Sequence, residues 1–181
     1  MTRIILTYGL TSGLVVIGAS LGVILIGGGG GHQSNLFLGY LIMLVALSSI
    51  LVGVKQHRDR ALGGVIKFRT ALGLGLGIAV VASLVYVAVW EVYLAMTHYA
   101  FMGQYTAKIL EAKRAAGVSG ADYAKAAQEM DAMRQQYANP LYRLPETFAE
   151  IFPVGLLIAI VSAALLRNPR FLPARSRPAA A

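Results

Sequence analysis

The sequence contains no cysteine. This absence excludes disulfide bridges, thiolate metal sites and cysteine nucleophiles. The chain also lacks the Gly-x-Ser-x-Gly and His-Glu-x-x-His motifs, which are typical of serine hydrolases and zinc peptidases. The serines at positions 12, 20, 48, 49, 83 and 162 lie in apolar stretches, where hydroxyl groups usually bond back to the helix backbone. We therefore expect a protein that is not an enzyme and that uses no cofactor and no metal.

Charge is scarce as well, because only 13% of the 181 residues are charged while 57% are hydrophobic. Soluble domains carry about 25% charged residues. The formal net charge of +8 is compatible with a nucleic-acid partner. No basic segment, however, alternates with the aromatic residues on which single-stranded bases stack. We expect no nucleic-acid binding.

In place of charged residues, the chain contains long apolar stretches. Residues 4–26, 36–54, 68–94 and 146–166 are each long enough to cross a bilayer, which takes about 20 residues. The first stretch has a competing interpretation as a cleaved signal peptide, but it exceeds the apolar core of about 7–15 residues that such peptides have. The sequence predicts an all-α, integral membrane four-helix bundle over residues 1–167.

The positive charges lie at one end of the predicted bundle. The connector at residues 54–69 contains five basic residues, namely Lys55, Arg58, Arg60, Lys67 and Arg69. Its only acidic residue is Asp59. Short Lys/Arg-rich loops stay in the cytoplasm, so these residues should determine the topology. Arg3 and a basic, Pro-rich tail at 168–181, predicted to be disordered, fall on the same side. We expect both termini in the cytoplasm and contact with the lipid bilayer, including anionic lipids.

The segment between the third and fourth spans is polar and balanced in charge. Apolar residues recur at helical spacing on both sides of Gly117, at Tyr105, Ile109, Ala112 and Ala116, and then at Tyr123, Ala126, Met130, Met133 and Tyr137. Residues 104–138 are therefore predicted to form an amphipathic helical hairpin outside the cytoplasm, and Ser119 with Asp122 resembles a capping box. Its apolar face packs on itself, lies on the membrane or meets a partner.

Glycines recur in the apolar stretches at spacings that allow helices to approach closely. The predicted packing positions are Gly9, Gly13, Gly18, Gly22, Gly39, Gly53, Gly73, Gly77 and Gly155.

The run of five glycines at 27–31 lies between two apolar stretches and is not a predicted packing position. No Lys-Ser/Thr follows it, so it does not form a phosphate-binding loop and is predicted to be an outer turn.

Four residues are candidates for a functional role, although none belongs to a specific motif. Glu91 lies near the outer end of the third span and is either an interfacial structural residue or a cation or proton site. His98 follows seven residues later and should lie on the same helical face as Glu91. Glu150 should reach the same outer surface, where the carboxylates of Glu91 and Glu150 would share a site if the third and fourth spans touch. Pro153 should kink the last span, which is expected to open with Pro145.

Several segments resemble one known family. They are residues 39–43, 53–59 and 63–68 in the first half, with Asn-Pro-Leu-Tyr-Arg at 139–143 and Glu-Ile-Phe-Pro-Val-Gly at 150–155 in the second. These segments are similar to the bacterial membrane family catalogued as domain of unknown function 4199, and the resemblance extends to about Arg167. His57 stands where that family is expected to have an aromatic residue. The resemblance implies a four-span protein of the bacterial inner membrane, and it implies no activity and no functional residues.

Two functions are compatible with these features. The first is a non-enzymatic structural or interaction subunit, in which the hairpin and the basic end bind other proteins or lipids. The second is a small-solute or ion transport component that uses Glu91 and Glu150. Four spans seldom enclose a path alone, so we expect a homo- or hetero-oligomer.

Overall fold

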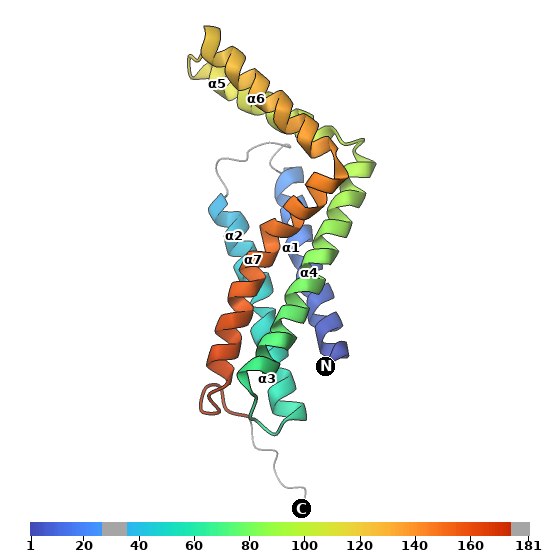
Figure 1. Ribbon diagram of the computed structural model, residues 1–181, viewed down its shortest axis with the longest axis vertical. Helices are drawn as coiled ribbons and strands as arrows, with labels where there is room; N and C mark the ends of the chain where they lie inside the picture. The colour runs from blue at the N-terminus through green and yellow to red at the C-terminus, as the bar shows by residue number, and fades with distance from the viewer. Residues whose placement is uncertain (27–35, 175–181) are drawn as a thin grey trace, which may run out of the picture.

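The computed structural model describes residues 1–26 and 36–174, and they are all-α (Figure 1). The four long apolar helices are α1 (Thr2–Ile26), a second span made of α2 (Leu36–Leu47) and α3 (Ser49–Ala61), α4 (Phe68–Met96) and α7 (Pro140–Leu166). The helices α5 (Ala100–Ala115) and α6 (Gly120–Ala138) form the hairpin between the third and fourth spans. The start of α1 and the end of α7 lie at the end of the bundle opposite to the hairpin.

The core of the bundle lies along α4, which packs against both α1 and α7. Leu74 and Ile78 of α4, Ile50 of α3 and Ile151 of α7 are fully buried there. A hydrogen bond between the side chains of Ser12 and Ser49 joins α1 to α3. Because α1 contributes buried residues to this core, it is a structural part of the bundle.

Small residues allow these close approaches. A Cβ atom added at Gly9, Gly13, Gly53, Gly77 or Gly155 would lie 2.6–2.9 Å from a neighbouring helix, so these five predicted positions are helix contacts. Gly75 belongs with them, because its Cβ would lie 2.9 Å from Ala159. The other four predicted positions differ, since a Cβ at Gly18, Gly22, Gly39 or Gly73 would meet nothing within 4 Å.

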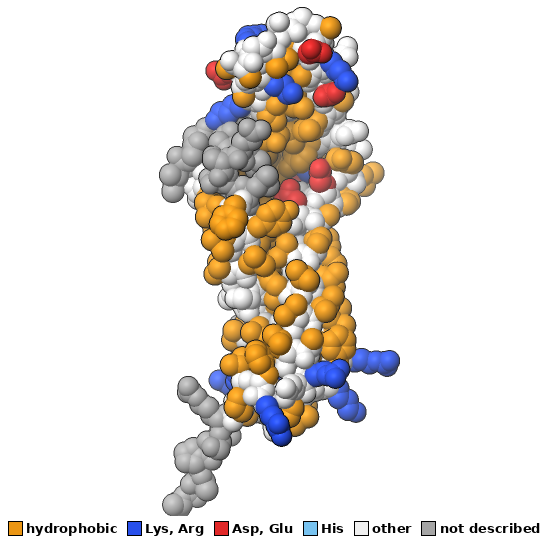
Figure 2. Space-filling view, turned by 90° about the vertical axis from the view of Figure 1, so that its left-hand side faces the viewer, with side chains coloured by type: hydrophobic (Ala, Val, Ile, Leu, Met, Phe, Trp, Pro, Cys, Tyr) orange, Lys and Arg blue, Asp and Glu red, His pale blue; other side chains and the backbone are white. Residues whose placement is uncertain are grey.

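The outside of the bundle is apolar. Figure 2 shows hydrophobic side chains along the shaft, with Lys and Arg side chains at one end and mixed charges on the hairpin at the other. Leu10, Leu14, Leu84 and Leu157 are among the exposed large hydrophobic residues. Lipid tails satisfy such a surface, whereas water does not. The chain is therefore a multi-pass membrane protein that contacts the bilayer.

The second span is longer than the predicted 36–54, because α3 continues through the first basic residues to Ala61. It ends where Gly63 (φ +63°) and Gly64 (φ +93°) take up the left-handed conformation, and the Gly64 N–H donates to the Arg58 carbonyl at 3.0 Å. Glycine adopts this conformation without strain. The true connector is therefore only the stretch between Ala61 and Phe68.

Arg58 is the one residue of the basic set whose side chain is completely buried within the described part of the chain. Its guanidinium donates to the carbonyl of Phe171 at 2.9 Å, to the carbonyl of Leu172, and to Asp59 Oδ1 at 2.7 Å. Residues 168–174, predicted to be disordered, are thereby held against α3. The rest of the predicted tail, 175–181, lies outside the described residues, and so does the five-glycine run at 27–31 that was predicted to be an outer turn.

The hairpin helices pack along each other, and α5 ends as the position of Gly117 predicts. Gly117 has φ +85°, and the next N–H, of Val118, donates to the Lys113 carbonyl at 3.0 Å. The predicted capping box does not form, because the Ser119 side chain makes no capping hydrogen bond. Instead, Arg114 lies over the ring of Tyr123, 4.9 Å from its centroid, and joins the two helices near the turn.

Candidate functional site

A buried ion pair fixes the hairpin end of the bundle. Arg143 of α7 donates through Nε and Nη2 to the two oxygens of Glu91 on α4, each at 2.7 Å. Its third contact is Nη1 to the Tyr137 carbonyl at 3.0 Å, and the rings of Tyr99 and Tyr137 lie 5.1 and 5.7 Å from the guanidinium carbon. The Arg143 side chain is 3% exposed and that of Glu91 25%. Such bidentate pairing fixes both position and orientation.

The beginning of α7 explains why Arg143 reaches Glu91. The helix starts at Pro140, not at Pro145 as the sequence predicted, and Asn139 caps it by accepting a hydrogen bond from the Leu141 N–H at 3.0 Å. Proline at the first helical position needs no N–H partner. Arg143 therefore lies in the first turn of α7, directly after the hairpin.

Aromatic side chains form a wall beside the ion pair. The indole N–H of Trp90 donates to the Tyr137 hydroxyl at 2.8 Å and so joins α4 to α6. Phe101 meets the Trp90 ring edge-on at 4.9 Å, and Tyr105 stacks on Phe101 at 6.3 Å. Burial raises the pKa of the Tyr137 hydroxyl above its usual range.

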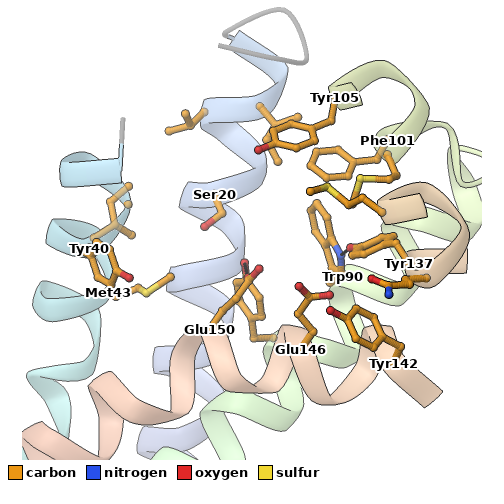
Figure 3. Close-up of a pocket in the computed structure, with 18 of the residues that line it drawn as sticks. Ser20, Tyr40, Met43, Trp90, Phe101, Tyr105, Tyr137, Tyr142, Glu146 and Glu150 are labelled. Carbon is orange, nitrogen blue, oxygen red and sulfur yellow. Dashed lines mark hydrogen bonds between the residues drawn. The ribbon is translucent and has the colours of Figure 1, made fainter. Parts of the chain in front are cut away.

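This wall borders a cavity of about 740 Å³ between the hairpin and the nearby ends of the spans (Figure 3). Ser20 of α1 and Tyr40 and Met43 of α2 lie on the opposite side. Figure 2 shows the hollow below the hairpin, with hydrophobic side chains above it and acidic side chains beside it. All four spans and both hairpin helices contribute lining residues.

Two carboxylates reach into the cavity from α7. Glu146 and Glu150 point from the same face of the helix into the space between the aromatic wall and α1 (Figure 3). The Tyr86 hydroxyl donates to Glu150 Oε2 at 3.4 Å, a long hydrogen bond. Glu129 of α6 lines the cavity from the hairpin side. Among the ion pairs of the described residues, none involves these three carboxylates.

The structure gives the candidate carboxylates different surroundings. Glu91 pairs with Arg143 and is not among the residues that line the cavity, whereas Glu150 lines it together with Glu146. The predicted helical relation between His98 and Glu91 is wrong, because α4 ends at Met96 and His98 has φ +51°. The described residues contain no group of three or more His, Cys, Asp or Glu side chains arranged to hold a metal ion.

Sequence reasoning missed Arg143, Glu146 and the cavity itself. In the sequence, Arg143 is one charge of the balanced segment between the third and fourth spans, although it follows Asn139 and Pro140, which can end one helix and begin the next. Glu146 lies four residues before Glu150, so both fall on one helical face. The sequence alone shows this spacing. It indicates a shared helical face only once α7 is known to begin before both residues.

Together these features define the class of the molecule: a four-span membrane bundle with a helical hairpin fixed over one end. The chain belongs to the family described as protein of unknown function (DUF4199), whose model matches residues 7–168. The resemblance found in the sequence is therefore confirmed. Comparisons with curated proteins and with solved structures find no significant match.

Proposed function

We propose that this protein is a non-enzymatic binding protein of the bacterial inner membrane, whose hairpin and spans together hold a molecule at the outer surface. The observation that carries the proposal is the cavity, because it is built jointly by the hairpin and the bundle and its volume of about 740 Å³ suits a small ligand. The Glu91–Arg143 pair supports it further, because Arg143 also donates to the Tyr137 carbonyl and so connects the hairpin to both α4 and α7.

The charge distribution supports the proposed orientation. The basic residues of α3 and of the connector lie at the end opposite to the hairpin. If that end is cytoplasmic, as the positive-inside rule requires, the cavity opens toward the outer side of the membrane. Both termini are then cytoplasmic as well.

The chemistry of the lining favours binding over catalysis. Its described residues include no histidine that could act as a base for Ser20. The transport alternative retains Glu150 but loses Glu91, whose carboxylate is engaged by Arg143. Below the cavity the spans close on fully buried residues such as Leu74 and Ile151, so a path would have to run through an oligomer.

Gentle extraction from native membranes, followed by mass determination of the intact particle, tests the proposal. Gly39 lines the cavity and has open space beside it, so Gly39→Phe places a ring in the cavity. Gly73→Phe is the matched control, because Gly73 also faces open space but does not line the cavity. We expect a co-purifying molecule with the wild type and Gly73→Phe that is lost with Gly39→Phe. Identical particles from all three proteins would contradict the proposal.

A further inference from the structure

Among the described residues, those that line the cavity carry charge of one sign only. Glu146, Glu150 and Glu129 contribute to it, and no lysine or arginine is found among its described lining residues. Carboxylates four residues apart on a helix repel each other, so Glu146 and Glu150 are stabilised by a positive charge placed between them.

The aromatic wall stands beside these carboxylates (Figure 3). It is formed by the ring contacts of Trp90, Phe101 and Tyr105 and by the hydrogen bond from Trp90 to Tyr137, and Tyr142 lies at its foot (Figure 3). The faces of such rings attract cations, most strongly for tryptophan, and quaternary ammonium groups are recognised in this way. Carboxylates beside aromatic rings are complementary to an organic cation, not to a bare metal ion.

The remainder of the lining is apolar and the volume is large. Ile24, Leu38 and Met43 line the side formed by α1 and α2. A cavity of about 740 Å³ is within the range of about 300–1,000 Å³ in which proteins bind drug-sized molecules. A single ammonium group would fill a small part of it, so the occupant must also have an apolar body.

The same lining argues against a phospholipid. A phosphate group requires arginine, lysine or clustered N–H donors, whereas here it would lie beside carboxylates. We propose that the cavity binds a free organic cation, an amine or quaternary ammonium compound with an apolar body and without phosphate. This inference rests on the proposed function and specifies the class of its ligand.

The chain contains a natural reporter, because Trp90 is its only tryptophan and lines the cavity. The full-length protein in lipid nanodiscs would be titrated with 4-phenylbutyl-trimethylammonium while tryptophan emission is recorded. The neutral analogue, in which carbon replaces nitrogen, and the anion 6-phenylhexanoate serve as comparison probes. We expect saturable binding of the cation that is about 10- to 100-fold tighter than binding of the neutral analogue.

Two double variants test whether the preference for the cation depends on the carboxylates in the cavity or on the general surface charge. Glu146→Gln with Glu150→Gln should remove the preference for the cation and leave the affinity for the neutral analogue unchanged. Glu111→Gln with Asp122→Asn is the matched control, since both residues are exposed on the hairpin and lie outside the cavity. This control should bind all probes as the wild type does.

The outcomes distinguish this inference from the proposed function. Equal affinity for the cation and the neutral analogue, or a cation preference that survives the Glu146/Glu150 double variant, overturns the inference but leaves a binding cavity. Displacement of the probe when phosphatidylethanolamine is added to the nanodiscs also overturns it, because a phosphate-bearing lipid then occupies the cavity. If no probe binds saturably and Gly39→Phe changes no native particle, the proposed function fails too.

Discussion

Glu91→Gln should destabilise the protein, and the expected size follows from the geometry of its ion pair. The substitution removes one negative charge and leaves the Arg143 guanidinium, with its side chain 3% exposed, without a counter-charge. Removing one partner of a buried pair costs about 3–5 kcal/mol. Because the Glu91 side chain is 25% exposed and glutamine keeps one hydrogen bond, we expect a loss of about 2–3 kcal/mol of unfolding free energy.

Removing both charges of the ion pair should lower the unfolding free energy by less than removing one of them. The double variant Glu91→Leu with Arg143→Met replaces the pair by apolar side chains, which often restores stability. Full recovery is not expected, because Arg143 also donates to the Tyr137 carbonyl and lies over the rings of Tyr99 and Tyr137. A residual loss of about 1–2 kcal/mol accounts for those contacts.

Equilibrium unfolding in mixed micelles of mild detergent and sodium dodecyl sulfate measures these differences, with Trp90 emission as the signal. Glu111→Gln is the control, because Glu111 is exposed on α5. The sign of the change in unfolding free energy distinguishes the two roles considered for Glu91. If Glu91 were a cation or proton site, neutralising it would relieve an uncompensated charge and leave stability unchanged or higher. An unfolding midpoint at or above that of the wild type would therefore refute the structural role of Glu91.

Three further predictions concern the bundle. Arg58→Ala should cost about 2–4 kcal/mol and release residues 168–174, so that limited trypsin digestion cuts there far faster; unchanged cleavage would contradict the role of the guanidinium. Gly75→Ala should destabilise by about 1–3 kcal/mol, because its Cβ would lie 2.9 Å from Ala159, whereas Gly73→Ala should be neutral or stabilising by about 0.5–1 kcal/mol in the same unfolding assay. A reporter active only outside the cytoplasm should be silent when fused after Ala61 and active when inserted at Gly117, and the reverse pattern would invert the proposed topology.

Hydropathy predicts the four spans because membrane crossing depends on the composition of a continuous stretch, which is a one-dimensional property. The ends of the spans were harder to predict, since charge alone does not end a helix. The basic residues after Val54 indicated a loop, yet α3 continues to Ala61 because its backbone stays hydrogen-bonded until Gly63 and Gly64 interrupt it. Polar side chains at the end of a span are compatible with helix.

The candidate site was predictable only in part, because its contacts join distant segments. Glu91 was identified as unusual from its apolar surroundings, but its partner Arg143 lies 52 residues away. Tyr105, Met133 and Tyr137 were predicted to form the apolar face of the hairpin. All three line the cavity, so part of that face meets the ends of the spans rather than only the other hairpin helix. Helical periodicity identifies an apolar face and does not identify what it faces.

Pro153 connects the sequence of α7 to the position of the two carboxylates. It lies inside the helix, where proline supplies no N–H for the carbonyl of residue 149 and its ring clashes with the preceding turn. Figure 1 shows α7 crossing the hairpin end of the bundle obliquely before it turns to run along α4. A straight helix continuing the direction of its second half would carry Glu146 and Glu150 parallel to the other spans. The bend instead lays that first part across the end of the bundle, where both carboxylates reach the cavity and Arg143 reaches Glu91. The ion pair and the cavity therefore depend on the same bend.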